Sequence, residues 1–98
     1  SSPDSALIKR VIAVEGETIE IRQNTVFIDG VAIEEPYLAE GTRMGAFGPV
    51  TVPDDHVFVM GDNRNPSQDS RRFGTVAESE IIGRAFVIVW PPSRWSGL

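Results

Sequence analysis

The chain has 98 residues, of which 41% are hydrophobic and 23% charged, a composition typical of a single small globular domain over residues 1–98. Its net charge of -5 leaves no basic stripe to neutralise phosphates, so we expect no nucleic-acid partner. The most apolar stretch, residues 81–90, contains an arginine and is much shorter than the roughly 20 residues that a membrane-spanning helix needs.

The first third of the chain has β-type patterns. Residues 6–14 form a nearly continuous apolar run, as in a strand covered on both faces. Residues 18–22 alternate strictly between apolar and polar, which predicts a strand with one buried face, and residues 25–28 form the next strand. Asp29-Gly30 follows, and this pair predicts a two-residue hairpin because a type I′ turn needs positive φ at both central positions.

The remaining segments continue the β pattern after one interruption. Residues 34–49 are rich in Gly, Pro and Glu, and we interpret them as an extended excursion outside the core. Residues 50–52 and 56–60 are predicted strands, residues 76–80 have room for one helical turn, and residues 81–90 are the last long strand. The sequence therefore predicts an all-β or nearly all-β fold, with a twisted sheet of short strands.

Lys9 is the only lysine in the chain, against eight arginines, and it lies inside the apolar run at residues 6–14. Strand alternation places Lys9 on one face with Leu7, Val11 and Ala13. The simplest interpretation is a lysine whose stem lies along apolar surface and whose ammonium reaches water. A strand covered on both faces favours a buried amine instead. Such an amine holds its proton less tightly and can deprotonate a serine hydroxyl.

The polar loop at residues 60–74 is dense in charge and follows an apolar strand directly. Its charges are balanced and could brace the loop through the side chains of Asp62, Asp69, Arg64 and Arg71. Loops of this kind at the rim of a core often carry function. Asp69 and Arg71 are two residues apart, so an extended backbone would let them pair. The alternative is a solvated surface turn with weak ion pairs.

A metal site fits this loop poorly. In a calcium loop starting at Asp62, the third and fifth ligand positions would be Arg64 and Pro66, and neither binds calcium. His56 is the only histidine and there is no cysteine, so a zinc site would need carboxylates to complete it. We expect no metal and no other cofactor.

Three blocks, in order, resemble the bacterial type I signal peptidases, membrane-bound Ser–Lys endoproteases that remove signal peptides from secreted proteins. The blocks are Lys9-Arg10-Val11-Ile12, then Gly61-Asp62-Asn63-Arg64 with Ser67 and Asp69-Ser70-Arg71, then Gly83-Arg84-Ala85 with Trp90-Pro91. The resemblance runs from about Leu7 to Pro91, and its middle block is highly specific. It implies an all-β fold with a coiled antiparallel sheet or partly open barrel, with at most one short helical turn.

The resemblance also implies roles for individual residues. Lys9 would be the catalytic general base, and Ser67 would orient its amine. Leu7 and Ile8 would line the shallow pockets for the small substrate residues before the cut. The structural brace of the site would consist of Arg10, Asp62, Asp69 and Arg71. The partners would be signal peptides of preproteins and, through an N-terminal anchor, the bacterial plasma membrane, with the catalytic domain on the extracytoplasmic face.

The family's nucleophilic serine stands in a Ser-Met-x-Pro-Thr type segment before the lysine strand. Ser1, Ser2 and Ser5 precede Lys9, and none of them is followed by methionine. We therefore expect these residues to be the C-terminal catalytic portion of such an enzyme, inactive alone and prone to self-association where the missing segment would cover the lysine strand.

Two alternatives remain open at this point. A self-cleaving Ser–Lys repressor domain resembles the same core, although the complete block from Asp62 to Arg71 argues against it. A non-catalytic peptide-binding β-module is the other alternative, and it predicts a solvent-exposed Lys9 without contact to Ser67.

Overall fold

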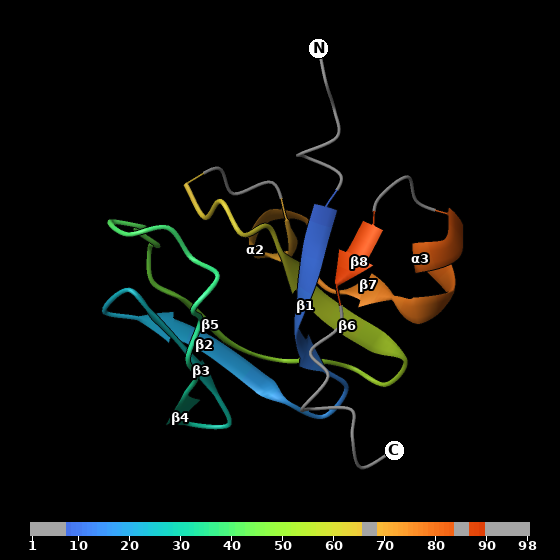
Figure 1. Cartoon of the computed structure of the whole chain (residues 1–98). Helices are drawn as coiled ribbons and strands as arrows, with labels where there is room; N and C mark the ends of the chain where they lie inside the picture. The colour runs from blue at the N-terminus through green and yellow to red at the C-terminus, as the bar shows by residue number, and fades with distance from the viewer. Residues whose placement is uncertain (1–7, 66–68, 84–86, 90–98) are drawn as a thin grey trace.

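The structure is a computed structural model that describes residues 8–65, 69–83 and 87–89, and in this part of the chain the strands form two four-stranded sheets (Figure 1). The first sheet has the order β7-β6-β1-β8, from β7 (Val76–Ala77), β6 (His56–Met60), β1 (Ile8–Val14) and β8 (Val87–Val89). The second has the order β4-β3-β2-β5, from β4 (Val31–Ala32), β3 (Thr25–Ile28), β2 (Thr18–Arg22) and β5 (Phe47–Thr51). The predicted all-β class with antiparallel sheets is confirmed.

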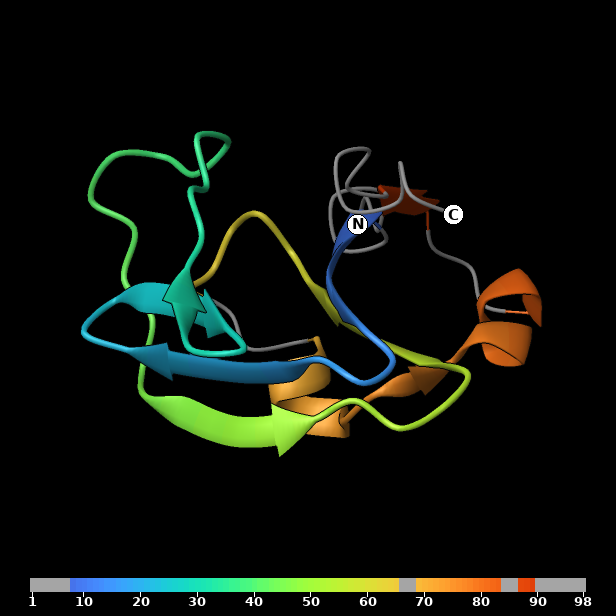
Figure 2. The same cartoon turned by 90° about the horizontal axis from the view of Figure 1, so that it is seen from below.

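The two sheets meet where β1 turns into β2, and Figure 2 shows the chain passing from one to the other at this point. Gly16 at the turn has φ 82° and donates its N–H to the Val52 carbonyl at 2.9 Å, while the Val52 N–H donates to the Glu17 carbonyl at 2.8 Å. The end of β5 is thereby tied to the turn that leaves β1. Within the described residues, β1 and β8 are the one parallel pair, and the other pairs are antiparallel.

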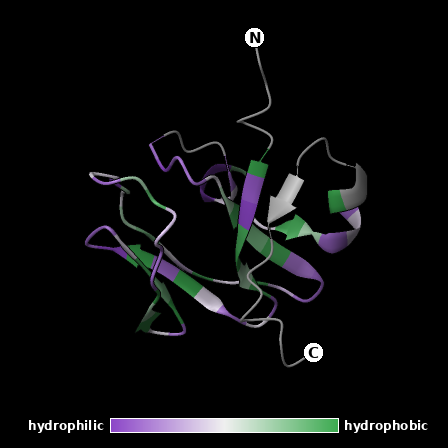
Figure 3. Cartoon of the chain, viewed as in Figure 1, coloured by the Kyte–Doolittle hydropathy of each residue, from purple (hydrophilic) through white to green (hydrophobic). Residues whose placement is uncertain are grey.

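Hydrophobic side chains cover both faces of the central strands β1 and β6, as the apolar run at residues 6–14 predicts. One cluster lies between the sheets and contains Ile12 and Phe58, and the other contains Val11 and Val59. The β1–β6 ladder shifts register between Val11 and Ala13, which places Ala13 with Ile12 and not with Val11 as strict alternation predicts. Figure 3 shows a hydrophilic band near the start of an otherwise hydrophobic β1.

The strands at residues 18–22, 25–28 and 56–60 have the predicted bounds. In the predicted hairpin, Asp29 and Gly30 have φ values of 53° and 82°, so both central residues have the positive φ of a type I′ turn. β5 begins at Phe47, earlier than the predicted start at residue 50. The reason is pairing that sequence does not reveal, since Phe47 lies opposite Ile21 of β2 and its ring centroid lies 5.4 Å from that of Phe58.

Two short helices are described where the sequence predicts at most one helical turn. α3 (Glu78–Gly83) includes residues 81–83, which were expected in the last long strand, and the described part of that strand is β8. A short apolar run does not by its periodicity distinguish a strand from a helix. α2 (Ser70–Phe73) lies in the polar loop, with Asp69 as its N-cap. No helix in the described residues is long and apolar enough to cross a membrane.

Candidate functional site

Lys9, the second residue of β1, is only 8% exposed, so the predicted burial is confirmed and the exposed lysine of the β-module alternative is not found. The antiparallel register pairs Arg10 with Met60, which brings Lys9 beside Gly61. A Cβ built on Gly61 would lie 3.9 Å from the Lys9 Nζ. The amine is therefore a near neighbour of the Gly61 backbone, close to the start of the polar loop.

Two residues that the resemblance assigns to the site, Ser67 and Leu7, lie outside the described residues. Ile8 is described and is 48% exposed at the start of β1. A large apolar side chain that remains open to solvent next to a buried amine is available for contact with a ligand.

The predicted pair between Asp69 and Arg71 is present and nearly buried, with side-chain exposures of 2% and 7%. Its two bonds run from the Arg71 Nε to Asp69 Oδ1 at 2.9 Å and from Nη2 to Oδ2 at 2.8 Å. The backbone is not continuously extended as the spacing suggested. Asp69 is the N-cap of α2 and accepts the Arg71 N–H at 3.1 Å, so the arginine folds back from the first helical turn.

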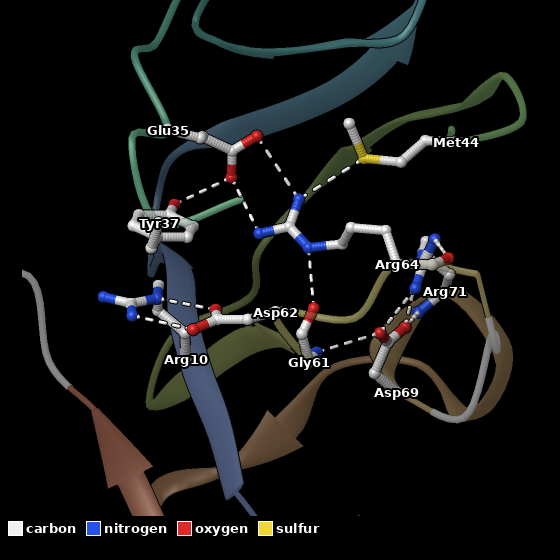
Figure 4. A network of polar contacts seen from close by, with 9 residues as sticks. All are labelled: Arg10, Glu35, Tyr37, Met44, Gly61, Asp62, Arg64, Asp69 and Arg71. Carbon is white, nitrogen blue, oxygen red and sulfur yellow. Dashed lines mark hydrogen bonds and ion pairs between the residues drawn. The ribbon is translucent and has the colours of Figure 1, made fainter. Parts of the chain in front are cut away.

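Gly61 is held through both of its backbone polar groups. Its N–H donates to Asp69 Oδ2 at 3.1 Å, and its carbonyl accepts from the Arg64 Nε at 2.7 Å. The Arg71 Nη1 donates to the Arg64 carbonyl at 3.0 Å, which links the two arginines. Figure 4 shows these side chains converging on the loop backbone. The described residues of the loop are thus held by internal bonds and are not the solvated turn of the alternative interpretation.

Arg10 pairs with Asp62, as the resemblance implies. Its Nε and Nη2 donate to the two Asp62 carboxylate oxygens at 2.8 and 2.9 Å. Because successive strand residues point to opposite faces, Arg10 projects away from Lys9. Its guanidinium lies 3.7 Å from the centroid of the Tyr37 ring. The hydrogen bond to Asp62 is the largest cause of a raised Arg10 pKa, which keeps this side chain cationic.

Sequence reasoning missed Glu35 and Tyr37, since residues 34–49 were expected outside the core. Glu35 accepts from the Arg64 Nη2 at 2.8 Å and from its Nη1 at 3.3 Å, and the two side chains are 6% and 0% exposed. The Tyr37 hydroxyl donates to Glu35 at 2.8 Å. One signal was available, because three arginines of the first two blocks, Arg10, Arg64 and Arg71, outnumber Asp62 and Asp69, so pairing all three takes a third carboxylate.

Tyr37 has an altered acidity in this setting. Its burial, followed by the hydrogen bond to Glu35, raises the pKa of Tyr37 to about 12. Beside it, a cleft of about 280 Å³ lies between residues 37–42 and the loop residues Asp62, Asn63 and Asn65. Within the described residues, no group of three or more histidine, aspartate and glutamate side chains is placed to hold a metal ion.

These contacts define a chemical capability. A buried amine is held against an ordered backbone, and the charged groups around it are paired. An amine in such a setting can accept a proton from a hydroxyl that is brought to it.

Comparison with known proteins finds relatives over most of this chain. A family model described as "Signal peptidase, peptidase S26" matches residues 1–90. A signal peptidase I from Mycobacterium tuberculosis is 44% identical over 114 residues, which cover 94% of this chain and 39% of that protein. A probable signal peptidase I-1 from Synechocystis is 45% identical over 93 residues, which cover 95% of this chain and 47% of that protein. The chain spans less than half the length of these curated relatives.

Among solved structures, a signal peptidase I from Enterococcus faecalis V583 is similar to this chain with a TM-score of 0.62 and 35% identity. The match covers 72% of this chain and 74% of that one. The likeness therefore extends to the fold as well as to the sequence.

We predict that Asp69→Ala destabilises the chain by about 3 kcal/mol, because it leaves Arg71 buried without its partner. The melting temperature, followed by circular dichroism, should fall clearly. Glu20→Ala is the matched control, since its pair with Arg22 is exposed and long at 3.5 Å. An Asp69→Ala melting curve that superimposes on that of the parent would contradict this prediction.

Tyr37 is the only tyrosine of the chain, so an ultraviolet absorbance titration reports on it alone. We predict a midpoint near pH 12, as the pKa of about 12 requires. The same chain unfolded in urea should titrate near the ordinary tyrosine value of about 10. Since the folded pKa is the higher one, Tyr37 contributes stability that is complete below about pH 10 and is lost as the pH rises toward 12. Equal midpoints in the folded and unfolded chains would be inconsistent with the buried contact to Glu35.

Proposed function

Because the chain belongs to the signal peptidase family, peptidase S26, we propose that it is the catalytic portion of a membrane-associated serine endopeptidase. The enzyme removes N-terminal signal peptides from preproteins after a small residue. Relatives named signal peptidase I support this substrate class. The single observation that carries the mechanism is the buried Lys9, whose amine lies against Gly61 in the loop that follows β6.

In the proposed mechanism Lys9 is the general base. Its neutral amine takes the proton of a serine hydroxyl while the serine oxygen attacks the carbonyl carbon of the scissile bond. The resulting ammonium then gives the proton to the leaving amine, so the lysine returns to its starting state. We assign Ser67 the role of orienting the amine. Burial supports the role of Lys9, because it places the amine at the covered side of β1 beside Gly61, where a bound serine could reach it without competition from bulk water.

The paired charges around the loop form the brace of the site. Asp69 of one pair accepts the Gly61 N–H, and Asp62 of the other pair is the next residue in the chain after Gly61, which supports a positioning role for both pairs. Leu7 and Ile8 are assigned to the substrate pockets. The exposure of Ile8 supports this assignment, since an apolar surface beside the base suits a small apolar substrate side chain.

The nucleophile is assigned to a serine other than those of the 98 residues, because none of the latter is followed by methionine. The 98-residue chain alone is then inactive. We further propose that the enzyme is anchored in the bacterial plasma membrane with its catalytic domain on the extracytoplasmic face, as the family resemblance implies.

We predict that Lys9→Ala, in a preparation of the protein that cleaves a signal-peptide substrate, lowers kcat by about a hundredfold or more, as expected for loss of a general base. Arg22→Ala is the control, since Arg22 is half exposed on the second sheet. Cleavage can be followed by gel or fluorogenic peptide. Undiminished cleavage by Lys9→Ala would refute the mechanism, and turnover by the 98-residue chain would refute the placement of the nucleophile.

We also predict that the 98-residue chain self-associates in solution through the exposed start of β1. Ile8→Asn should shift the distribution toward monomer in light scattering, because it removes the apolar contact. Val31→Asn is the matched control, since Val31 is 66% exposed on the other sheet. A parent chain that is strictly monomeric at high concentration would refute this prediction.

A further inference from the structure

We propose that Glu35 and Tyr37, in the segment between β4 and β5, are positioning residues for Lys9 that act through Arg64 and Gly61. This inference rests on the role proposed above for Lys9 as the general base. Neither residue belongs to the sequence blocks that identify the family resemblance, and both come from the segment that was expected outside the core.

The first step is the buried ion pair between Glu35 and Arg64. The two side chains are 6% and 0% exposed and share two hydrogen bonds, at 2.8 and 3.3 Å. A charge removed from water is tolerated only when its partner stays in place. The pair therefore holds the segment between β4 and β5 against the loop after β6, two parts of the chain that are 29 residues apart in sequence.

The second step is the direction in which the Arg64 guanidinium points. Glu35 occupies one edge of this planar group, and Met44 Sδ lies 3.3 Å from the same Nη1. The remaining Nε then donates to the Gly61 carbonyl at 2.7 Å. Because the five N–H groups of a guanidinium are fixed in one plane, the carboxylate on one edge decides where the Nε can donate. Glu35 thus sets the bond that Arg64 makes to Gly61.

The third step leads from Gly61 to the amine. Gly61 has no Cβ, and the Lys9 Nζ lies 3.9 Å from the point where one would stand, so the amine is a near neighbour of the Gly61 backbone. Asp69 holds the N–H of Gly61 and Arg64 holds its carbonyl, so each group restrains one side of the same residue. Loss of Glu35 would free the carbonyl side, and the backbone against which the amine packs could then move.

Tyr37 connects the Glu35–Arg64 pair to the Arg10–Asp62 pair. Its hydroxyl donates to Glu35 at 2.8 Å, and its ring lies 3.7 Å below the Arg10 guanidinium that pairs with Asp62. A cation over an aromatic face is attracted to it. The ion pairs on either side of the segment are therefore coupled through one half-buried tyrosine, and the loop is restrained at Asp62 as well as at Gly61.

The first experiment measures the backbone of Gly61 directly and needs no catalytic activity. Amide hydrogen exchange of Gly61 is followed by NMR in the parent chain and in Glu35→Gln, with Glu20→Gln as the matched control on an exposed pair. In Glu35→Gln, the buried Arg64 loses its charged partner and fixes the Gly61 carbonyl less firmly. We therefore expect the Gly61 amide to exchange about tenfold faster in Glu35→Gln and at the parent rate in Glu20→Gln. Parent-like exchange at Gly61 in a folded Glu35→Gln chain would overturn the proposal.

A milder variant covers the case in which Glu35→Gln does not fold. Tyr37→Phe removes the hydroxyl that donates to Glu35 and keeps the ring below Arg10. It should accelerate exchange at Gly61 in the same direction but less strongly, and it should leave the amide of Val26 in the core unchanged. Tyr37→Phe with parent-like exchange at both amides would also overturn the proposal.

The second experiment separates positioning from mere support of the fold. In a preparation that cleaves a signal-peptide substrate, Glu35→Gln should lower kcat by about tenfold while KM changes by less than about twofold, because the base is misplaced and substrate contacts remain. An unchanged kcat despite faster exchange at Gly61 would overturn the link to catalysis. If the proposed function itself is wrong, Lys9→Ala retains cleavage activity. The exchange rate of the Gly61 amide still decides, in that case too, whether Glu35 restrains the loop.

Discussion

The buried ion pair between Glu35 and Arg64 is the contact on which the order of the site depends. It joins two segments that have no strand pairing with each other, and Arg64 at its centre also binds the carbonyl of Gly61. A fully buried guanidinium requires a carboxylate partner, since desolvation of the unpaired charge would outweigh most other contacts of the loop. The excursion between β4 and β5 is therefore part of the site, although it contributes little to the hydrophobic core.

A single strand supplies both the amine and one half of the brace. Lys9 and Arg10 are adjacent in β1, and strand alternation sends them to opposite faces. Lys9 enters the covered side near Gly61, whereas Arg10 reaches Asp62 and the Tyr37 ring. The polar loop starts directly after β6, the antiparallel neighbour of β1, so the loop meets both side chains at once. A shift in the β1–β6 register would therefore move Lys9 away from Gly61 and Arg10 away from Asp62 at the same time.

Much of the fold could be predicted from local patterns. The alternation at residues 18–22 predicts a strand, and Asp29-Gly30 predicts a type I′ turn. The structure has both. The apolar run at residues 81–83 has two solutions, strand or helix, and the prediction of a strand there was wrong. The Asp69–Arg71 pair was predicted correctly, but from an extended backbone where the structure has a helix cap. The contact was correct because the two residues remain neighbours in either conformation.

The sequence by itself determined the family and the all-β class, because each depends on short-range pattern or on motif blocks that can be read in order. It favoured burial of Lys9 but left an exposed lysine open, and the structure decided for burial. Only the tertiary structure decided which carboxylate neutralises Arg64. Glu35 is separated from it by 29 residues, and nothing in the local pattern of residues 34–49 distinguishes Glu35 from Glu34 or Glu40. Pairing across such a distance is selected by packing of the whole chain, since the desolvated arginine accepts only the carboxylate that the fold can bring to it.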